Sequence, residues 1–266
     1  MAMSLKNKIV FITGASSGMG KASAEQFAAA GARLIITARR KERLETLARA
    51  LHERYHVDVL PLSLDVQDRK QIDTLIKELT ESWQPIDILL NNAGVALTSD
   101  KFQDADPENW DKMIQINLCG LLYVTHAILP GMIARDRGHI INVSSTAGYD
   151  YYPRGNVYCA TKHAVKAISK SLRLDLIGTS LRVTDIAPGM TETEFSEVRW
   201  QDSARAKEMY AGFTPLAAED IADAIVYCAT RPLHVDISEM VIFPTAQASV
   251  HHIYKSGGSH QDLFKT

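Results

Sequence analysis

A tyrosine and a lysine one helical turn apart are the residues of this sequence best suited to chemistry. Tyr158 and Lys162 stand in an i, i+4 relation, which on a helix puts both side chains on one face. A cation beside a phenol favours the phenolate and lowers its pKa from about 10. Ser145 ends an apolar, strand-like run upstream, so its hydroxyl could point to the same place. We therefore predict a proton-transfer site here.

A glycine-rich turn follows the first apolar run of the chain. It reads Thr13-Gly-Ala-Ser-Ser-Gly-Met-Gly20 and joins a predicted strand to a predicted helix. Glycines let the backbone turn tightly and approach a pyrophosphate closely, and the helix N-terminus favours negative charge. The glycine spacing is a variant of the dinucleotide fingerprint, and an ordinary tight turn is the alternative interpretation. The predicted phosphate cradle consists of Gly14, Ser16, Ser17, Gly18, Met19 and Gly20.

The end of the second predicted strand indicates which nicotinamide cofactor is bound. An acidic residue there would bind the adenosine ribose hydroxyls, whereas a basic one accommodates a 2′-phosphate. Here Arg39, Arg40 and Lys41 follow the strand, with no carboxylate before Glu42. These cations predict NADP(H) rather than NAD(H) as cofactor. A solvated start to a helix is the alternative, and it is stronger for Lys41 than for Arg39.

Short apolar runs alternate with amphipathic stretches along the whole chain. Strands that are apolar on both faces and alternate with helices indicate a parallel sheet covered on two sides. We predict an α/β fold: a single Rossmann-type doubly wound domain over residues 1–266, with a seven-stranded, mostly parallel sheet and helices on both faces. The predicted strands span residues 9–12, 33–37, 57–60, 86–90, 139–143, 181–186 and 240–243, and the helices 18–30, 41–55, 69–83, 107–135, 157–176 and 219–229.

Some segments depart from this alternation. Residues 191–213 form an insertion before the last predicted helix, and residues 244–266 form a polar tail, expected to be partly disordered or used in assembly. Pro130 is expected to kink or break the long helix over residues 107–135.

Composition excludes several functions. The formal net charge of -2 over 266 residues gives no reason to expect nucleic acid or an acidic membrane surface as a partner. No apolar run reaches the roughly 18 residues of a membrane span, and the first residues lack a signal pattern. Three scattered cysteines suit free thiols in a reducing cytoplasm. His251 and His252 lack ligand partners at useful spacing, so no metal site is expected.

Together these motifs resemble those of the short-chain dehydrogenase/reductase family, over roughly residues 8–243. The matching residues are the glycine turn, Asn91-Asn-Ala-Gly94 after the fourth predicted strand, Asn117 in the long helix, Ser145, Tyr158-x-x-x-Lys162, and Pro188-Gly189 after the sixth strand. The resemblance implies hydride transfer between the nicotinamide C4 and a carbonyl or alcohol carbon. It also implies a homotetramer built partly from the helices over residues 107–135 and 157–176.

The resemblance assigns a role to each matching residue. Tyr158 would give or take the proton, and Lys162 would hold the nicotinamide ribose and lower the pKa of Tyr158. Ser145 would donate a hydrogen bond to the substrate oxygen, and Asn117 would hold a water that links Lys162 to solvent. Further cofactor contacts are implied for Asp65 and Val66 at the adenine, for Asn92, Ala93 and Gly94 at the ribose, and for Pro188, Gly189 and Thr191 around the carboxamide.

Other interpretations of these residues stay open on sequence grounds. Asn92 and Asp65 could be turn formers and helix caps. Ser144 could replace Ser145 as the polarising hydroxyl, because alternation along a strand lets only one of the two face the site.

Finer resemblance concerns the substrate. Residues 153–158, 189–200 and 244–254 resemble a subgroup of NADP-dependent 3-hydroxy acid dehydrogenases that act on serine and allo-threonine. A carboxylate substrate needs a cation, for which Arg154 and Arg199 are the candidates. Each could equally be a surface or intersubunit arginine. A broad-range carbonyl, sugar or ketoacyl reductase is the main alternative function, followed by a non-enzymatic NADP-binding protein.

Overall fold

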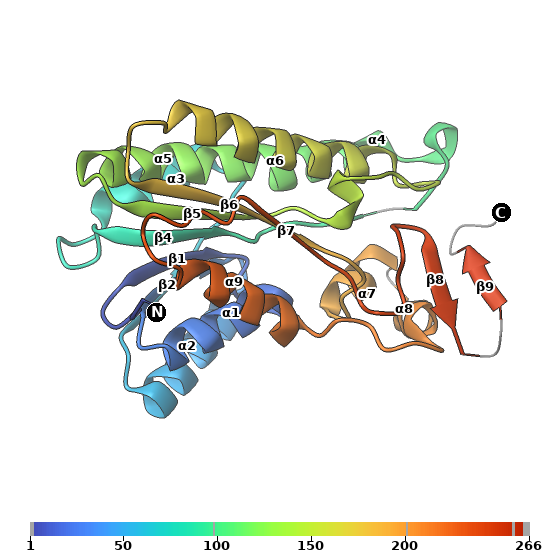
Figure 1. Ribbon diagram of the computed structural model, residues 1–266, viewed down its shortest axis with the longest axis horizontal. Helices are drawn as coiled ribbons and strands as arrows, with labels where there is room; N and C mark the ends of the chain where they lie inside the picture. Colours follow the sequence, from blue (N-terminus) through green and yellow to red (C-terminus); the bar gives the residue numbers. More distant parts are fainter. Residues whose placement is uncertain (1–2, 98, 201, 257–258, 263–266) are drawn as a thin grey trace.

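A seven-stranded sheet forms the middle layer of the molecule (Figure 1). The computed structural model describes residues 3–97, 99–200, 202–256 and 259–262, so parts of the predicted tail, at 257–258 and 263–266, lie outside the described residues. The strand order is β3-β2-β1-β4-β5-β6-β7, and every neighbouring pair is parallel. The strands are β1 (Ile9–Thr13), β2 (Arg33–Ala38), β3 (Val59–Ser63), β4 (Ile86–Asn91), β5 (Gly138–Val143), β6 (Leu181–Pro188) and β7 (Glu239–Ile242).

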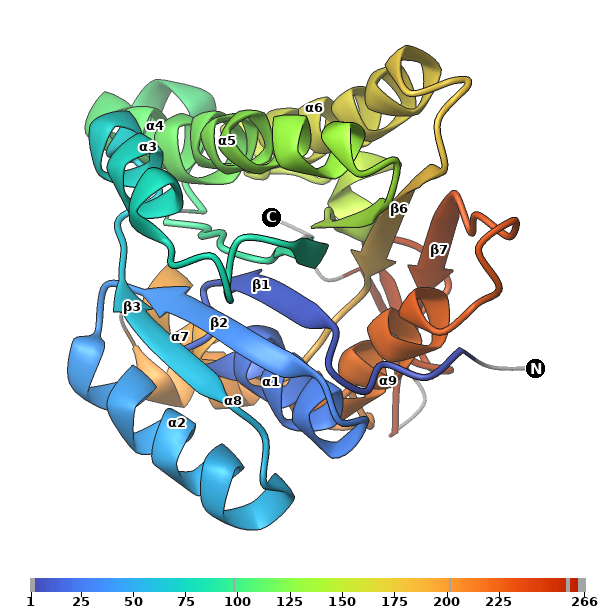
Figure 2. The same cartoon turned by 90° about the vertical axis from the view of Figure 1, so that its left-hand side faces the viewer.

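Helices cover both faces of this sheet (Figures 1 and 2). One face carries α3 (Arg69–Glu78), α4 (Pro107–Ile114), α5 (Leu121–Ala134) and α6 (Asn156–Asp175); the other carries α1 (Gly18–Ala29), α2 (Lys41–Tyr55) and α9 (Ala218–Ala229). Because both faces are covered, the central strands are largely buried, and all five residues of β1 are buried. The predicted fold class, a doubly wound sheet, is confirmed.

The long helical stretch contains an irregularity that the sequence did not predict. A π-helical turn, Gln115–Gly120, separates α4 from α5, and α5 continues through Pro130. The expected break at Pro130 is therefore wrong; the α-helical hydrogen bonding is interrupted a few turns earlier.

By length and mean hydropathy alone, Pro107–Ala134 would also suit a membrane span, a test that core helices of globular proteins pass as well. Its residues Val124, Ile128 and Met132 are buried in the hydrophobic core between this helix and the sheet.

The third strand lies two residues later than predicted, at Val59–Ser63, because pairing with β2 sets its register. It is an edge strand, and Pro61 lies opposite Ile36 of β2. The Leu64 N–H donates to the Ala38 carbonyl of β2. Since inward and outward N–H groups alternate along a strand, the ring nitrogen of Pro61 lies on the outer side.

The insertion and the tail are folded and lie together beyond one edge of the sheet (Figure 1). The insertion contains α7 (Glu194–Trp200) and α8 (Ser203–Tyr210). The tail forms an antiparallel hairpin of β8 (His252–Lys255) and β9 (Ser259–Asp262). The Lys255 ammonium donates to the carbonyls of Glu208 and Met209, which joins the hairpin to α8. The described residues of the tail thus form ordered structure, and the expectation that the tail is partly disordered or used in assembly stays a prediction.

Candidate active site

A cavity of about 890 Å³ opens at the carboxyl edge of the sheet. The strand order reverses between β1 and β4, and a doubly wound sheet binds ligands at this kind of switch point. The segments that follow β1 to β6 all contribute to the lining, and residues of α7, α8 and the tail close the far side. Every residue predicted to belong to the site lines this cavity except Gly20, Asn117 and the Asn91 side chain, which lie behind it.

The glycine turn after β1 is shaped for close backbone approach. Gly14 has φ +67, a left-handed conformation, and a Cβ there would lie 2.9 Å from Ala93 Cα. A Cβ on Gly20 would lie 2.4 Å from the Gly14 carbonyl oxygen. Asn92 braces the same turn by donating to the carbonyls of Thr13 and Gly14 at 3.0 and 3.2 Å. The cradle leaves the N-terminus of α1 facing the cavity, which fits a pyrophosphate.

Arg40 lies beside this cradle, and its contacts fit a phosphate as ligand. Its guanidinium donates to the hydroxyl of Ser16 at 3.0 and 3.2 Å and to that of Ser17 at 2.7 Å. Arg39 also lines the cavity; it is exposed and has no ion-pair partner within the described part of the chain. The Arg40 cation after β2 and the hydroxyls of Ser16 and Ser17 together suit a 2′-phosphate better than ribose hydroxyls alone.

Asp65 and Val66, the residues predicted to contact the adenine, line the cavity after β3. The Asp65 carboxylate accepts from the Gln67 N–H at 3.0 Å and thereby shapes the turn after β3. Gly120 approaches Val66 closely, since a Cβ on the glycine would lie 2.7 Å from Val66 Cγ2. In this structure Asp65 therefore both shapes the turn after β3 and lines the cavity.

Tyr158 and Ser145 meet as predicted. Their side chains share a hydrogen bond, which acts to lower the pKa of the phenol. The Ser145 hydroxyl also accepts from the Ala147 N–H at 3.1 Å. Ser144 instead directs its hydroxyl to the Ile186 carbonyl at 3.3 Å, behind the strand. Of the two serines, only Ser145 has its hydroxyl at the phenol.

The pKa of Tyr158 differs from the sequence-based expectation. Burial raises it well above 10, and Tyr152 adds to the rise, while the Ser145 hydrogen bond and the charge of Arg199 oppose it. The Lys162 Nζ lies 5.9 Å from the centre of the Tyr158 ring. In this structure desolvation outweighs the nearby charges, so the net shift of the Tyr158 pKa is upward; the effect of Lys162 on that pKa stays a prediction.

Lys162 is itself buried, with 6% of its surface exposed. Its ammonium donates to the Val143 carbonyl at 3.0 Å. Burial lowers the pKa of Lys162 from 10.5 to about 8, and the Asp185 carboxylate works against this change. A Cβ on Gly94 would lie 3.5 Å from Lys162 Nζ and 3.4 Å from Asn117 Oδ1, so the lysine and the asparagine flank this glycine.

The π-helical turn positions Asn117. Its carboxamide accepts from the Val95 N–H at 2.7 Å and donates to the Val95 carbonyl at 2.8 Å and to Thr161 at 3.1 Å. These bonds tie the segment after β4 to α6. Asn117 thus holds the segment that contains Gly94, a positioning contact that sequence analysis did not foresee.

The two candidate arginines lie in different surroundings. Arg154 is exposed at the rim, in a left-handed conformation with φ +68. Arg199 lies in the cavity wall, with its guanidinium carbon 5.5 Å from the centre of the Tyr152 ring. Its Nε and Nη2 are buried and have no hydrogen-bond partner among the described residues. The guanidinium also hydrogen-bonds the Tyr152 side chain, but two buried donors without acceptors are costly, so this site suits an anionic ligand.

Some residues of the cavity were not singled out from the sequence. Phe195 of α7 faces Tyr158, with ring centres 6.0 Å apart. Gln247, from the tail, accepts from the Met190 N–H at 2.8 Å and lies against Gly189, where a Cβ would meet its Oε1 at 2.6 Å. Neither residue lies within a motif, because both reach the cavity through long-range packing. Within the described ranges no group of three His, Cys, Asp or Glu side chains could hold a metal ion.

The protein belongs to the short chain dehydrogenase family, whose model matches residues 8–204. Sulfoacetaldehyde reductase 2 of Chromohalobacter salexigens is 47% identical over 90% of this chain and 95% of its own. The NADP-dependent 3-hydroxy acid dehydrogenase of Schizosaccharomyces pombe is 41% identical over 94% of this chain and 98% of its own. A solved structure described as the closed form of serine dehydrogenase complexed with NADP+ matches with a TM-score of 0.86 and 41% identity, covering 95% of this chain and 99% of that one.

These likenesses confirm the predicted family, its dehydrogenase class and the resemblance to the 3-hydroxy acid subgroup. The predicted cofactor is also confirmed at the level of these relatives, two of which carry NADP in their names. The comparisons support a small-molecule substrate but do not select one, because relatives named for 3-hydroxy acids and for sulfoacetaldehyde match this chain about equally well.

Proposed function

We propose that the protein is an NADP-dependent oxidoreductase that interconverts a small 3-hydroxy acid, such as serine or allo-threonine, and its 3-oxo form. The observation that carries the substrate class is the Arg199 guanidinium, whose Nε and Nη2 are buried and lack a hydrogen-bond partner among the described residues. A carboxylate would satisfy both nitrogens in the two-pronged geometry that arginine favours. Arg154, exposed at the rim, is the weaker candidate.

The chain's own residues fit NADP along the whole carboxyl edge. The Gly14 and Gly20 cradle would take the pyrophosphate, and Arg40 with Ser16 and Ser17 the 2′-phosphate. The remaining contacts would come from Gly18, Met19, Arg39, Asp65, Val66, Asn92, Ala93, Gly94, Tyr158, Lys162, Pro188, Gly189 and Thr191. NADP(H), when bound, supplies or accepts the hydride.

Tyr158 would transfer the proton at the substrate oxygen. With its pKa raised by burial, the phenol is protonated at neutral pH and is equipped to donate to a carbonyl oxygen as it becomes an alcohol. Ser145, bonded to the same phenol, would steady the charge that develops on that oxygen. In the opposite direction the phenol must first lose its proton, so alkaline pH should favour alcohol oxidation.

A sulfonate-bearing aldehyde is the second candidate substrate. The observation in its favour is the relative of 47% identity named sulfoacetaldehyde reductase 2. A sulfonate, like a carboxylate, is an oxyanion that Arg199 could bind. Both candidates therefore share one prediction: the substrate is a short molecule with an anionic group near its reacting carbon.

Substitution of the two arginines tests this proposal. We would measure kcat/KM of wild type, Arg199→Met and Arg154→Met for L-serine with NADP+, for sulfoacetaldehyde with NADPH, and for an uncharged secondary alcohol. Arg199→Met should lower the value for an acidic substrate about 10- to 100-fold and change the neutral alcohol little. Equal losses for acidic and neutral substrates would show that Arg199 does not bind the anion. The ratio of the first two wild-type values decides between the candidate substrates.

Tyr158→Phe tests the chemistry separately from binding. Turnover should be abolished while NADPH still binds, since only the proton donor is lost. Turnover equal to that of wild type would contradict the role given to Tyr158. Retained binding without turnover would also argue against a purely NADP-binding function for the wild type.

Further predictions about organisation stay proposals. We propose that residues 1–266 act as one domain, that the protein is a homotetramer and that it works in the cytoplasm. Large apolar side chains exposed on α5 and α6 support assembly through these helices, among them Leu122, Ile133 and Leu174. Light scattering of the purified protein would give the mass: a value near 29.4 kDa, that of one chain, would contradict the tetramer.

A further inference from the structure

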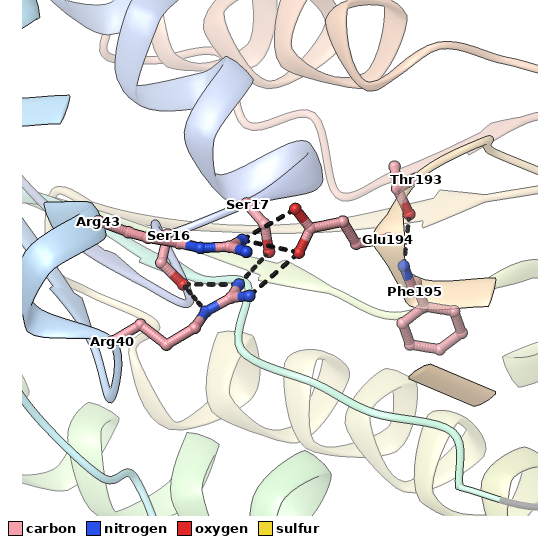
Figure 3. A network of polar contacts seen from close by, with 7 residues as sticks. All are labelled: Ser16, Ser17, Arg40, Arg43, Thr193, Glu194 and Phe195. Atoms are coloured by element: carbon pink, nitrogen blue, oxygen red, sulfur yellow. Dashed lines mark hydrogen bonds and ion pairs between the residues drawn. The ribbon is translucent and has the colours of Figure 1, made fainter. Parts of the chain in front are cut away.

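One carboxylate occupies the arginines of the proposed 2′-phosphate pocket. Glu194, the first residue of α7, accepts from Arg40 Nη1 at 3.1 Å and from Arg43 Nη1 at 2.9 Å through both carboxylate oxygens (Figure 3). The sequence separation between Glu194 and these arginines is more than 150 residues, so the contact joins the insertion to the dinucleotide-binding half. Burial would raise the pKa of Glu194, but hydrogen bonds from Arg40 and Arg43 outweigh it and lower the pKa, so the group is an anion at neutral pH.

Most donors of Arg40 are already committed in this arrangement. Its Nε and Nη2 point to the hydroxyls of Ser16 and Ser17, and its Nη1 points to Glu194. Figure 3 shows the guanidinium of Arg40 in contact with Ser16, Ser17 and the Glu194 carboxylate at the same time. A phosphate that binds Arg40 therefore meets a carboxylate on the same guanidinium, and two anions there repel each other.

The same segment also touches the phosphate cradle. A Cβ on Gly18 would lie 3.3 Å from the Thr193 Cβ, so Thr193 packs directly against the turn before α1. The next residue after Glu194 is Phe195, whose ring faces Tyr158 at 6.0 Å, and the same helix carries Arg199. One short helix thus connects Glu194 to the residues beside Tyr158.

We propose that Glu194 is a competing anion that senses the cofactor's 2′-phosphate. It holds Arg40 when the pocket is empty and passes to Arg43 alone when a 2′-phosphate takes Arg40. Because α7 begins at Glu194, this exchange repositions the helix that carries Phe195 and Arg199. The inference rests on the proposed function, in which Arg40 binds the 2′-phosphate; its new content is that Glu194 weakens this binding and links it to the substrate side.

Binding of two nucleotides to the isolated protein tests the competition without any turnover. 2′,5′-ADP carries the 2′-phosphate and 5′-AMP lacks it, so the ratio of their Kd values isolates that group. Glu194→Gln keeps the shape of the side chain and removes its charge. It should tighten 2′,5′-ADP about three- to tenfold in calorimetry and leave 5′-AMP unchanged. An affinity for 2′,5′-ADP that is unchanged or weaker, or equal gains for both nucleotides, would overturn the proposal.

Two further variants make the result specific. Glu192→Gln removes the same charge two residues away, from an exposed side chain outside the arginine pair, and should leave both Kd values unchanged. A gain as large as that of Glu194→Gln would mean that any lost negative charge suffices, which overturns the proposal. Arg40→Met should abolish the preference for 2′,5′-ADP; if the preference persists, Arg40 does not bind the 2′-phosphate, and the proposed cofactor site and the competition both fail.

Hydrogen exchange tests the link to α7. In wild type, 2′,5′-ADP should change the exchange of backbone amides in residues 192–200, and 5′-AMP should not. In Glu194→Gln this response should disappear, because the carboxylate that transmits it is gone. No response in wild type, or an equal response in the variant, would refute the coupling.

Discussion

The burial of Lys162 has a measurable effect on stability. A fall of the lysine pKa from 10.5 to about 8, at about 1.4 kcal/mol per pH unit, means that the charged side chain costs the folded state about 3 kcal/mol at pH 7. Lys162→Met removes the charge and keeps most of the volume. It also leaves the Val143 carbonyl without its donor, which costs about 1 kcal/mol. The variant should therefore be about 2 kcal/mol more stable than wild type and lack activity.

The pH dependence of this difference is the sharper test. Below pH 8 Lys162 is charged in both the folded and the unfolded state, so the full cost is present. Between pH 8 and 10.5 the folded state binds fewer protons than the unfolded state, so the stability of wild type rises with pH. The advantage of Lys162→Met should shrink from about 2 kcal/mol at pH 7 to near zero at pH 9.5.

Urea unfolding of both proteins at pH 7 and pH 9.5, followed by tryptophan fluorescence and circular dichroism, measures these quantities. In a thermal melt at pH 7, a gain in the free energy of unfolding of this size should raise Tm by about 4 to 8 °C. Lys170→Met is the matched control, because Lys170 lies on the same helix and forms an exposed ion pair with Glu239. It should change the free energy of unfolding by less than about 0.5 kcal/mol. If Lys162→Met is less stable than wild type, or its effect is independent of pH, the argument from burial is refuted.

Three further outcomes are expected. Gly20→Ala should weaken NADPH binding at least about tenfold, because its Cβ would meet the Gly14 carbonyl at 2.4 Å; Gly131→Ala, where a Cβ meets only the tip of Arg135, should bind normally in the same fluorescence titration. Cys119 should react first with a thiol reagent at pH 8, because Cys228 is buried and burial raises its pKa to about 11; equal rates would contradict the buried position of Cys228. Gln247→Ala should raise KM for the acid substrate about fivefold, since the Met190 N–H loses its acceptor, and a larger change in the Kd of NADPH would contradict this.

The sequence predicted the parts of the structure that depend on local pattern. Apolar runs such as residues 9–12 and 86–90 became central strands because only buried strands tolerate side chains that are apolar on both faces. The glycine turn and the Tyr158, Lys162 pair were found because their chemistry needs fixed spacings. Strand β3 was misplaced because its register depends on hydrogen bonds to β2, which no local pattern records.

The remaining features depend on contacts between distant segments. The pair of Glu194 with Arg40 and the seat of Gln247 beside Gly189 become visible only when the insertion and tail are placed. The π-helical turn at Gln115–Gly120 has no composition signal, since its residues would also suit an ordinary helix. Spacing reveals a charge beside Tyr158 but not the extent of burial, which raises the pKa of the phenol.

The proline in strand β3 bears on how the protein behaves when crowded. A free sheet edge offers a row of N–H donors to any other chain, and such pairing is a route to aggregation. At Pro61 the outward-facing donor is missing, yet no bond to β2 is lost, since its nitrogen faces away from the sheet. The residue thus limits the length of any foreign strand that could add to this edge. Pro61 thus hinders pairing of another strand with this edge and leaves the hydrogen bonds within the sheet intact. This arrangement favours colloidal stability at high concentration.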